Sequence, residues 1–290
     1  MNPSSLIMLT IAALLAGFVN GLLGQGFSSL MVPTGLLMAP ARLLNPALVI
    51  IELPLNGGAA WLHRHRLRKL AGELAPFALA LLPGVLLGVL MMRRLPDGLL
   101  KAACYGLLLL LVCAQFLGPH LARPSSGGPM PRWARIRFGF GTGALYGLTT
   151  ISGPILAAYA HRRGYLKNDA RAALAILRVL EGVLSLIALI PLGLIAPPYL
   201  RLAAILLPAA LLGLLIGHGF AAKVEESGFR RLALGFNLLA VLAGLARALS
   251  PLTWIPAVVV PALWTGAALT ALWLLFDWAP ALFSRPGAST

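Results

Sequence analysis

Long apolar stretches recur along the chain and define its predicted elements. Each is about 20 residues long, the length that an α-helix needs to cross roughly 30 Å of hydrocarbon. Eight of them contain almost no charged residue, namely Leu6–Leu23, Pro46–Leu62, Leu74–Met92, Leu99–Leu117, Phe138–Tyr159, Leu200–Ala222, Leu232–Ala246 and Trp254–Phe276. A ninth, Ala172–Ile195, is equally apolar but contains Arg178 and Glu181. The pattern predicts a helical protein that crosses a membrane several times.

The first apolar element is too long for one crossing. Leu6–Ala39 has 34 residues, which would extend about 51 Å as a single helix. Its centre, Gly24–Ser29, is rich in Gly and Ser and unfavourable for helix. We therefore expect a re-entrant hairpin of two half-helices, with Thr149–Pro154 as the matching tip later in the chain.

An internal repeat divides the chain into two homologous halves. Seven of the eleven residues in Leu81–Met91 are identical to those in Leu206–Ile216. The segment Gly17–Gly21, with glycine at both ends, recurs as Gly143–Gly147. The predicted divisions are a first membrane repeat (1–120), a cytoplasmic linker (121–134), a second membrane repeat (135–250) and an additional C-terminal transmembrane helix with its tail (251–290).

Composition agrees with a membrane protein and excludes a soluble domain. Hydrophobic residues make up 59% of the 290 residues and charged residues 11%, with a mean hydropathy of +0.89. The net charge of +15 comes from basic residues in short connections between apolar stretches. That distribution follows the positive-inside rule, so we expect no nucleic-acid partner.

Charge counting favours hairpins over ordinary crossings. With two re-entrant hairpins, 16 of the 23 Lys and Arg residues lie on one face, six lie on the other, and Arg178 lies in the membrane. Three full crossings then remain in each half, so the second half is inserted upside down. The predicted fold is an all-α polytopic membrane protein with two inverted-topology repeats, each a broken-helix hairpin plus three transmembrane helices, and one extra C-terminal helix. We expect it in a bacterial-type inner membrane, with the basic loops cytoplasmic.

The hairpin tips are the candidate binding site. A hydroxyl at the helix start and a proline in the first turn are both favourable there, and the free amides and positive end of each returning half-helix would face the midplane and favour an anion. Alternatively, the glycines only permit tight helix packing, as we expect for the pairs in Gly84–Gly88 and Gly213–Gly217. The predicted substrate-binding residues are Gly24, Gln25, Gly26, Phe27, Ser28, Ser29, Asn56, Thr149, Thr150, Ile151, Ser152, Gly153 and Arg178.

Glu52, Arg178 and Glu181 are the ionisable residues deep within predicted spans, where burial is costly. The repeat offset of 126 residues pairs Glu52 with Arg178, which would bring them close across a pseudo-twofold axis. Arg178 would bind the anion, and Glu52 or Glu181 would carry a coupling proton. The alternative is that the three form structural ion pairs that hold the halves together. No cofactor, metal or enzyme motif is found, so we expect a protein that is not an enzyme.

Several segments resemble the TauE/SafE sulfite exporter family. They are the glycine-rich Gly17–Gly26, the following Val32-Pro33, the basic loop Trp61–Leu67 and the two repeated helices that contain Pro83 and Pro208. The resemblance covers roughly residues 10–250. It implies export of small sulfur-containing anions such as sulfite, sulfoacetate or other sulfonates, with proton coupling. The family usually has a run of glycines where this chain has Phe27-Ser28-Ser29, which leaves the identity of the anion open.

Two other functions are compatible with the same sequence. A passive anion channel would not need a coupling carboxylate, and a membrane scaffold or assembly factor would not need Arg178. The expected partners are a small anionic substrate, protons and membrane lipids, and the chain could form a homodimer.

Overall fold

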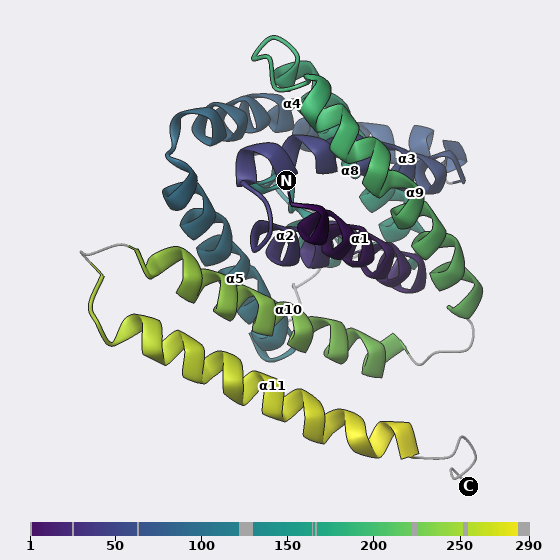
Figure 1. Cartoon of the computed structure of the whole chain (residues 1–290). Helices are drawn as coiled ribbons and strands as arrows, with labels where there is room; N and C mark the ends of the chain where they lie inside the picture. Colours follow the sequence, from purple (N-terminus) through teal and green to yellow (C-terminus); the bar gives the residue numbers. More distant parts are fainter. Residues whose placement is uncertain are drawn as a thin grey trace, which may run out of the picture.

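The computed structural model describes residues 2–24, 26–62, 64–121, 130–163, 165, 167–221, 226–251 and 255–283. These residues form helices and short connections without any strand (Figure 1). The helices are α1 (Pro3–Leu23), α2 (Phe27–Leu36), α3 (Ala41–Leu62), α4 (Arg64–Arg94), α5 (Asp97–Leu121), α6 (Arg132–Thr149), α7 (Gly153–Arg162), α8 (Lys167–Leu189), α9 (Pro197–Phe220), α10 (Glu226–Leu249) and α11 (Val259–Phe283).

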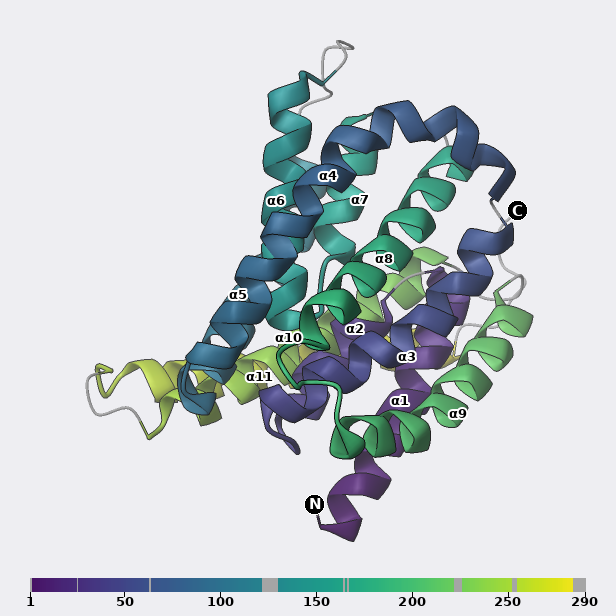
Figure 2. The same ribbon diagram turned by 90° about the horizontal axis from the view of Figure 1, so that it is seen from above.

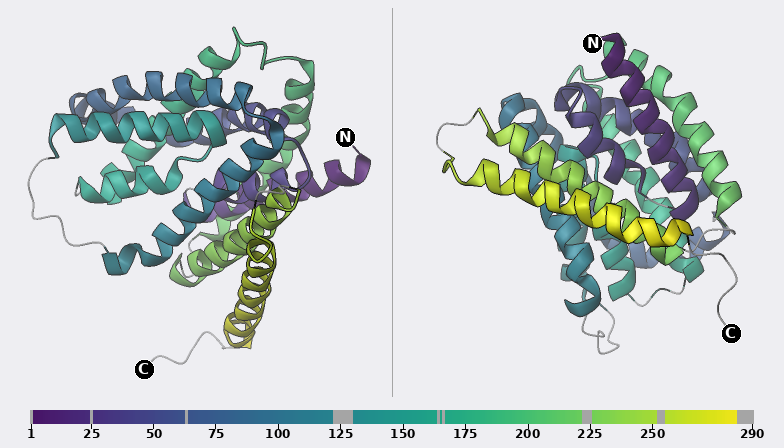
Figure 3. Two further views of the ribbon diagram at one scale, coloured as in Figure 1. Left: turned by 90° about the vertical axis from the view of Figure 1, so that its left-hand side faces the viewer. Right: turned by 60° about the horizontal axis from the view of Figure 1, so that its bottom comes forward.

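Seven helices in the described part of the chain are long and apolar enough to cross a membrane: α1, α3, α4, α5, α8, α9 and α10. The prediction of an all-helical polytopic membrane protein is confirmed. The apolar part of α11 is shorter, Val259–Leu274, so its crossing stays a prediction, and Trp254 lies outside the described residues. Most of the predicted linker, residues 122–129, also lies outside them, and α6 begins three residues before the predicted start of the second repeat. Helix α11 lies along the outside of α10 (Figure 3).

The first predicted hairpin is a helix, a break and a returning helix. A Cβ on Gly26, next to the break, would lie 3.5 Å from Val19 of α1. Further along α2, a Cβ on Gly35 would lie 3.4 Å from Leu9, much nearer the start of α1. Since contacts with α1 move backward as α2 moves forward, the two helices are antiparallel.

Helices α6 and α7 form the second hairpin in the same way. The ring of Tyr159 lies 5.9 Å from that of Phe138, and the Arg162 guanidinium lies 5.7 Å from the same ring. Residues late in α7 therefore lie beside residues early in α6, so these arms are also antiparallel. The placement of both hairpins relative to a membrane stays a prediction.

Each hairpin packs against the other half of the chain through glycines. Helix α1 lies against α9, and α6 lies against α4 (Figure 2). A Cβ on Gly17 would lie 2.1 Å from the Ala210 carbonyl oxygen, and one on Gly143 would lie 2.4 Å from the Leu81 carbonyl oxygen. Such backbone-to-backbone approach is possible only for glycine, which is how small residues bring membrane helices together. The glycines of α4 and α9 that we assigned to packing have that role.

For the predicted repeat, the helix contacts favour an alignment that differs from the sequence alignment by one helical turn. A Cβ on Gly84 would lie 2.2 Å from the Phe140 carbonyl oxygen of α6, and one on Gly213 would lie 2.0 Å from the Leu14 carbonyl oxygen of α1. Phe140 and Leu14 are 126 residues apart, so under the predicted repeat Gly84 would be the equivalent of Gly213. The sequence alignment paired Gly213 with Gly88 instead, because leucine-rich helices align almost equally well four residues out of register.

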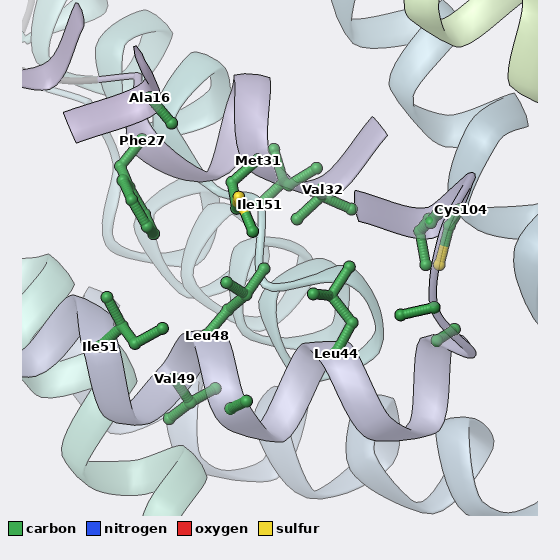
Figure 4. Close-up of a cluster of buried hydrophobic side chains, with 14 of the residues drawn as sticks. Ala16, Phe27, Met31, Val32, Leu44, Leu48, Val49, Ile51, Cys104 and Ile151 are labelled. Carbon is green, nitrogen blue, oxygen red and sulfur yellow. The ribbon is translucent and has the colours of Figure 1, made fainter. Parts of the chain in front are cut away.

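The hydrophobic core lies where α2 crosses α3 (Figure 4). Phe27 and Met31 of α2 face Leu48 and Ile51 of α3, and all four side chains are almost fully buried. Ile151, from the tip of the second hairpin, packs into the same cluster. The core therefore fixes both tips against the same stretch of α3, close to Glu52.

Candidate functional site

The two tips share their backbone geometry although their sequences differ. Helix α1 is capped at its C-terminus by Gly24, in the left-handed region with φ of 69°, and α6 by Thr150, in the same region with φ of 59°. The glycine adopts this conformation without strain, whereas Thr150 is β-branched and adopts it at a cost of order 1–3 kcal/mol. Two positions later, Gly26 and Ser152 precede the first residues of α2 and α7. Gln25 lies outside the described residues.

Ser28, at the first tip, does not cap α2 as we predicted, whereas Ser152 directly precedes α7 and its carbonyl accepts the amides of Ile155 and Leu156. The cap position of α2 is Gly26, without a side-chain hydrogen bond, and Ser28 lies inside the first turn. The Ser28 hydroxyl donates to Glu52 Oε1 instead. The backbone amides of the first turn, including those of Phe27 and Ser28, therefore have neither a helical acceptor nor a side-chain cap.

Glu52 lies on α3 and accepts hydrogen bonds on both carboxylate oxygens. Ser28 binds Oε1, and the Tyr146 hydroxyl of α6 donates to Oε2 at 2.8 Å. The carboxyl group is 3% exposed, so these two donors replace the water that it would otherwise bind. Glu52 thereby joins the tip of the first hairpin to the arm of the second.

Glu181 occupies a related position on α8 but has only one donor. Ser152, at the tip of the second hairpin, donates to Oε2 at 2.6 Å. The other oxygen, Oε1, is buried without a hydrogen-bond partner. Each carboxylate thus binds a serine from the tip of its own half, and the two differ in the hydrogen bonding of their second oxygen.

Arg178 lies one turn before Glu181 on α8, and its side chain is 7% exposed. A Cβ built on Gly153, the first residue of α7, would lie 2.5 Å from its Nη2 atom, so the guanidinium lies against the start of that helix. Within the described part of the chain, Arg178 makes no hydrogen bond and no ion pair within 4 Å. It is near enough to Glu52 and Glu181 to interact with both electrostatically.

This arrangement bears on the two interpretations of the ionisable residues. The prediction that Glu52 and Arg178 lie close together agrees with the structure, but a direct ion pair between them is absent among the described contacts. The site contains one guanidinium and two carboxyl groups, all buried. With both carboxyl groups ionised, the site carries a net negative charge.

The other predicted residues divide by what their side chains contact. Phe27 and Ile151 are 1% exposed and belong to the hydrophobic core, so only their backbone faces the tips. The Thr149 hydroxyl donates to the Leu145 carbonyl at 2.8 Å and accepts from the Ile151 amide at 3.1 Å, and Thr150 donates to the Thr149 carbonyl at 2.6 Å. These threonines therefore hold the shape of the tip.

Asn56 and Ser29 lie beside this group without a defined role. Asn56 is 7% exposed, one turn after Glu52 on α3, and makes no hydrogen bond among the described residues. Ser29 is half-buried in the first turn of α2. No group of three or more His, Cys, Asp and Glu side chains suited to a metal ion occurs in the described ranges.

Sequence reasoning missed three polar residues of the site. Tyr146 binds Glu52, as described above. The Asn45 amide donates to the Leu148 carbonyl at 2.8 Å, while its own oxygen and the Ser185 hydroxyl are buried without partners. Together with Thr150, these side chains line a narrow gap between α3, α6 and α8. The sequence does contain one indication of Tyr146. The 126-residue offset pairs it with Asn20, so each first hairpin arm has a polar residue at the same place in an apolar stretch, and both are buried.

One comparison with known proteins identifies a family. The sequence model of the family described as "Sulfite exporter TauE/SafE" matches residues 9–245, which is most of the chain. No curated protein and no solved structure matches it. The resemblance found in the sequence is confirmed over nearly the same residues.

Proposed function

Since this chain belongs to the TauE/SafE family of membrane transporters, we propose that it is a secondary active transporter of small sulfur-containing anions, such as sulfite, sulfoacetate or other sulfonates. The observation that carries the proposal is Arg178, a buried cation without a direct partner in the described part of the chain. An unpaired buried charge is costly, so a site that keeps one is suited to a ligand of opposite charge. We propose that the anion binds there, between the two tips.

Two further features favour an anion at this position. The first-turn amides of α2 have no cap, and Arg178 lies against the first residue of α7. A helix start attracts negative charge through its free amides and its dipole. A sulfonate or sulfite group has several acceptor oxygens, so it can bind the guanidinium and helix amides together. A neutral substrate would leave the guanidinium without a direct anionic partner in the described part of the chain.

Proton coupling follows from the charge balance of the site. Two ionised carboxylates outweigh one guanidinium, so an arriving anion would add to a net negative charge in a low-dielectric region. A proton on one carboxyl group removes that repulsion. Glu52 already accepts two hydrogen bonds, which stabilise its ionised form, whereas Glu181 Oε1 has no donor. We therefore assign the exchanging proton to Glu181 and a structural role to Glu52.

Alternating access would move two packed bodies of helices relative to each other around the tips. Because α1 is packed on α9 and α6 on α4, the bodies that move contain helices from both halves. The basic connections would face the cytoplasm of a bacterial-type cell, in accordance with the positive-inside distribution.

Proteoliposome uptake of sulfite, sulfoacetate, taurine, thiosulfate and sulfate tests this proposal, with and without a pH gradient. We expect saturable flux of at least one anion, driven by the gradient and lost in Arg178→Gln. The matched control is Arg94→Gln, which removes an exposed arginine far from the tips in sequence. Absence of flux for every anion would favour the scaffold function instead.

Glutamine substitutions separate the two carboxyl groups. Glu181→Gln should abolish gradient-driven flux but preserve anion exchange between equal pH values, because glutamine imitates the protonated acid. Glu52→Gln should reduce both activities, because Tyr146 and Ser28 lose a charged acceptor. Flux that is indifferent to the gradient and to Glu181→Gln would show a passive channel.

A further inference from the structure

A second concave site lies between α4 and α6, lined by side chains that differ from those at the tips. The groove has a volume of about 500 Å³. Pro76, Leu79 and Pro83 of α4 form one wall, and Arg132, Ile136 and Phe140 of α6 form the other. Leu79 is 74% exposed, and Ile136 and Phe140 are also exposed. Figure 2 shows the two helices side by side along one edge of the molecule.

The helix sequences explain the shape of this groove. The wall residues recur at spacings of three and four, so they form one stripe along each helix. Next to these stripes, the glycines of α4 and α6 bring the two backbones into direct contact. Helix α4 also curves and contains Pro76 and Pro83 within its length (Figure 2). Close backbones between the two helices and larger side chains on either side leave a largely apolar trough, lined by residues of α4 and α6.

One end of the trough is basic. Arg132 and Arg137 both line it, both are exposed, and neither forms an ion pair among the described residues. The Arg137 guanidinium lies 5.5 Å from the ring centre of Trp133, which is 60% exposed. Arginine beside an exposed tryptophan is typical of the membrane–water interface.

The depth of these residues fits the headgroup layer. If the tip at Thr149 is near the midplane, Phe140 lies about 14 Å from it along the helix axis, Arg137 about 18 Å and Arg132 about 25 Å. The hydrocarbon ends about 15 Å from the midplane and the headgroups extend to roughly 22 Å. Phe140 would therefore contact acyl chains, Arg137 would lie within the headgroup layer, and the long side chain of Arg132 would reach that layer from just outside it.

The equivalent helix pair lacks this charge. Under the 126-residue offset, Arg132 and Arg137 correspond to Leu6 and Ile11 of α1. Helix α1 packs closely on α9 without a cation at these positions. Arg132 and Arg137 are therefore not required for the close packing of α6 on α4.

We propose that the groove between α4 and α6 binds an anionic phospholipid, with its phosphate between Arg132 and Arg137 and an acyl chain along Leu79, Pro83 and Phe140. Charge complementarity selects this occupant, because a zwitterionic lipid brings its own cation to the same place. The groove is separate from the tips, so this inference does not depend on the transported anion.

Native mass spectrometry of the full-length protein with phosphatidylglycerol and phosphatidylcholine tests the proposal. The variant is Arg132→Gln/Arg137→Gln. The matched control is Arg64→Gln/Arg162→Gln. Both of these arginines are exposed and lie on the same predicted membrane face as Arg132 and Arg137, and each lies over one aromatic ring of its own. Each arginine near an anionic membrane surface strengthens binding about fivefold. Removal of two should therefore weaken phosphatidylglycerol binding roughly 30-fold. The control should change it by less than about threefold.

Two further variants keep the test decisive if the double glutamine variant misfolds. Arg132→Lys/Arg137→Lys keeps the charge and should retain most of the binding. Leu79→Trp fills the trough at a side chain that is already 74% exposed, and should displace the lipid while both arginines remain. Circular dichroism and size-exclusion chromatography check that each variant is folded.

The outcomes separate clearly. Selective loss of phosphatidylglycerol in the groove variants, with the control unchanged, supports the site. Equal binding of phosphatidylglycerol and phosphatidylcholine to the wild type overturns it, since the arginines would then confer no selectivity. Equal loss in the control variant also overturns it, because the effect would then come from the overall basic charge.

Discussion

Gly153→Ala tests whether the position of Arg178 determines anion binding. The new Cβ would lie 2.5 Å from Arg178 Nη2, whereas ordinary contacts lie at 3.4–4 Å, so the guanidinium must move by about 1 Å. A hydrogen bond to a charged group contributes about 1.5–3 kcal/mol. Loss of one such bond to the anion should weaken its binding roughly 10- to 100-fold.

The same change should affect stability little. Alanine is favoured over glycine within a helix by about 0.5–1 kcal/mol, while the following Pro154 disfavours a side chain in helical conformation at Gly153. These effects oppose each other, and the atom in the way is the end of a flexible side chain. We expect the free energy of unfolding to change by less than about 1 kcal/mol.

The assay is equilibrium anion binding to purified protein by isothermal titration calorimetry, with thermal unfolding measured in parallel. Gly235→Ala of α10 is the matched control, since its Cβ would meet the flexible Leu274 side chain of α11 at 2.5 Å and none of the residues around Arg178. The reasoning is refuted if Gly153→Ala binds the anion as tightly as the wild type. Equal weakening in both variants would also refute it, because the effect would then be general crowding.

Two other predictions concern contacts between the halves. Tyr146→Phe removes one donor from Glu52 and should lower the free energy of unfolding by about 1–3 kcal/mol, measured by denaturant titration in detergent; no change would mean that the 2.8 Å contact contributes nothing. Gly143→Leu forces a side chain against the Leu81 carbonyl oxygen, 2.4 Å from the new Cβ, and should cost more than about 4 kcal/mol or prevent folding. Gly141→Leu on the same helix is its control, because nothing lies within 4 Å of a Cβ there, and it should retain the wild-type melting temperature.

Local sequence features predicted much of the fold. The helix breaks at Gly24 and Thr150 follow from residues that are unfavourable in helices, and the apolar stretches have the length of membrane helices. The buried position of Arg178 could be predicted because a cation within a membrane-spanning stretch almost always faces the protein interior instead of lipid. These inferences depend on residues close together in the sequence.

Contacts between distant segments could not be predicted in the same way. Tyr146 is 94 residues from Glu52, and neither residue indicates the other by local pattern. The serine hydroxyls at the tips were expected to cap helices because that is their usual local role, but Ser28 and Ser152 bind carboxylates on the next long helices. The repeat stays a prediction, and the glycine contacts favour a register one turn away from the leucine-based alignment, because leucine side chains give little information on alignment.

The crossed glycine contacts also constrain how a protein of this kind could arise from a shorter one. Helix α1 finds its close partner in α9, and α6 finds its partner in α4, so neither half contains the surface that its own hairpin needs. A single ancestral half would have left these glycine faces against lipid, where close backbone approach is impossible. Under the predicted inverted topology, pairing with a second copy inserted in the opposite direction would have covered them. Duplication and fusion would then have preserved that dimer within one chain and allowed the two sites to diverge, as the unequal surroundings of Glu52 and Glu181 illustrate.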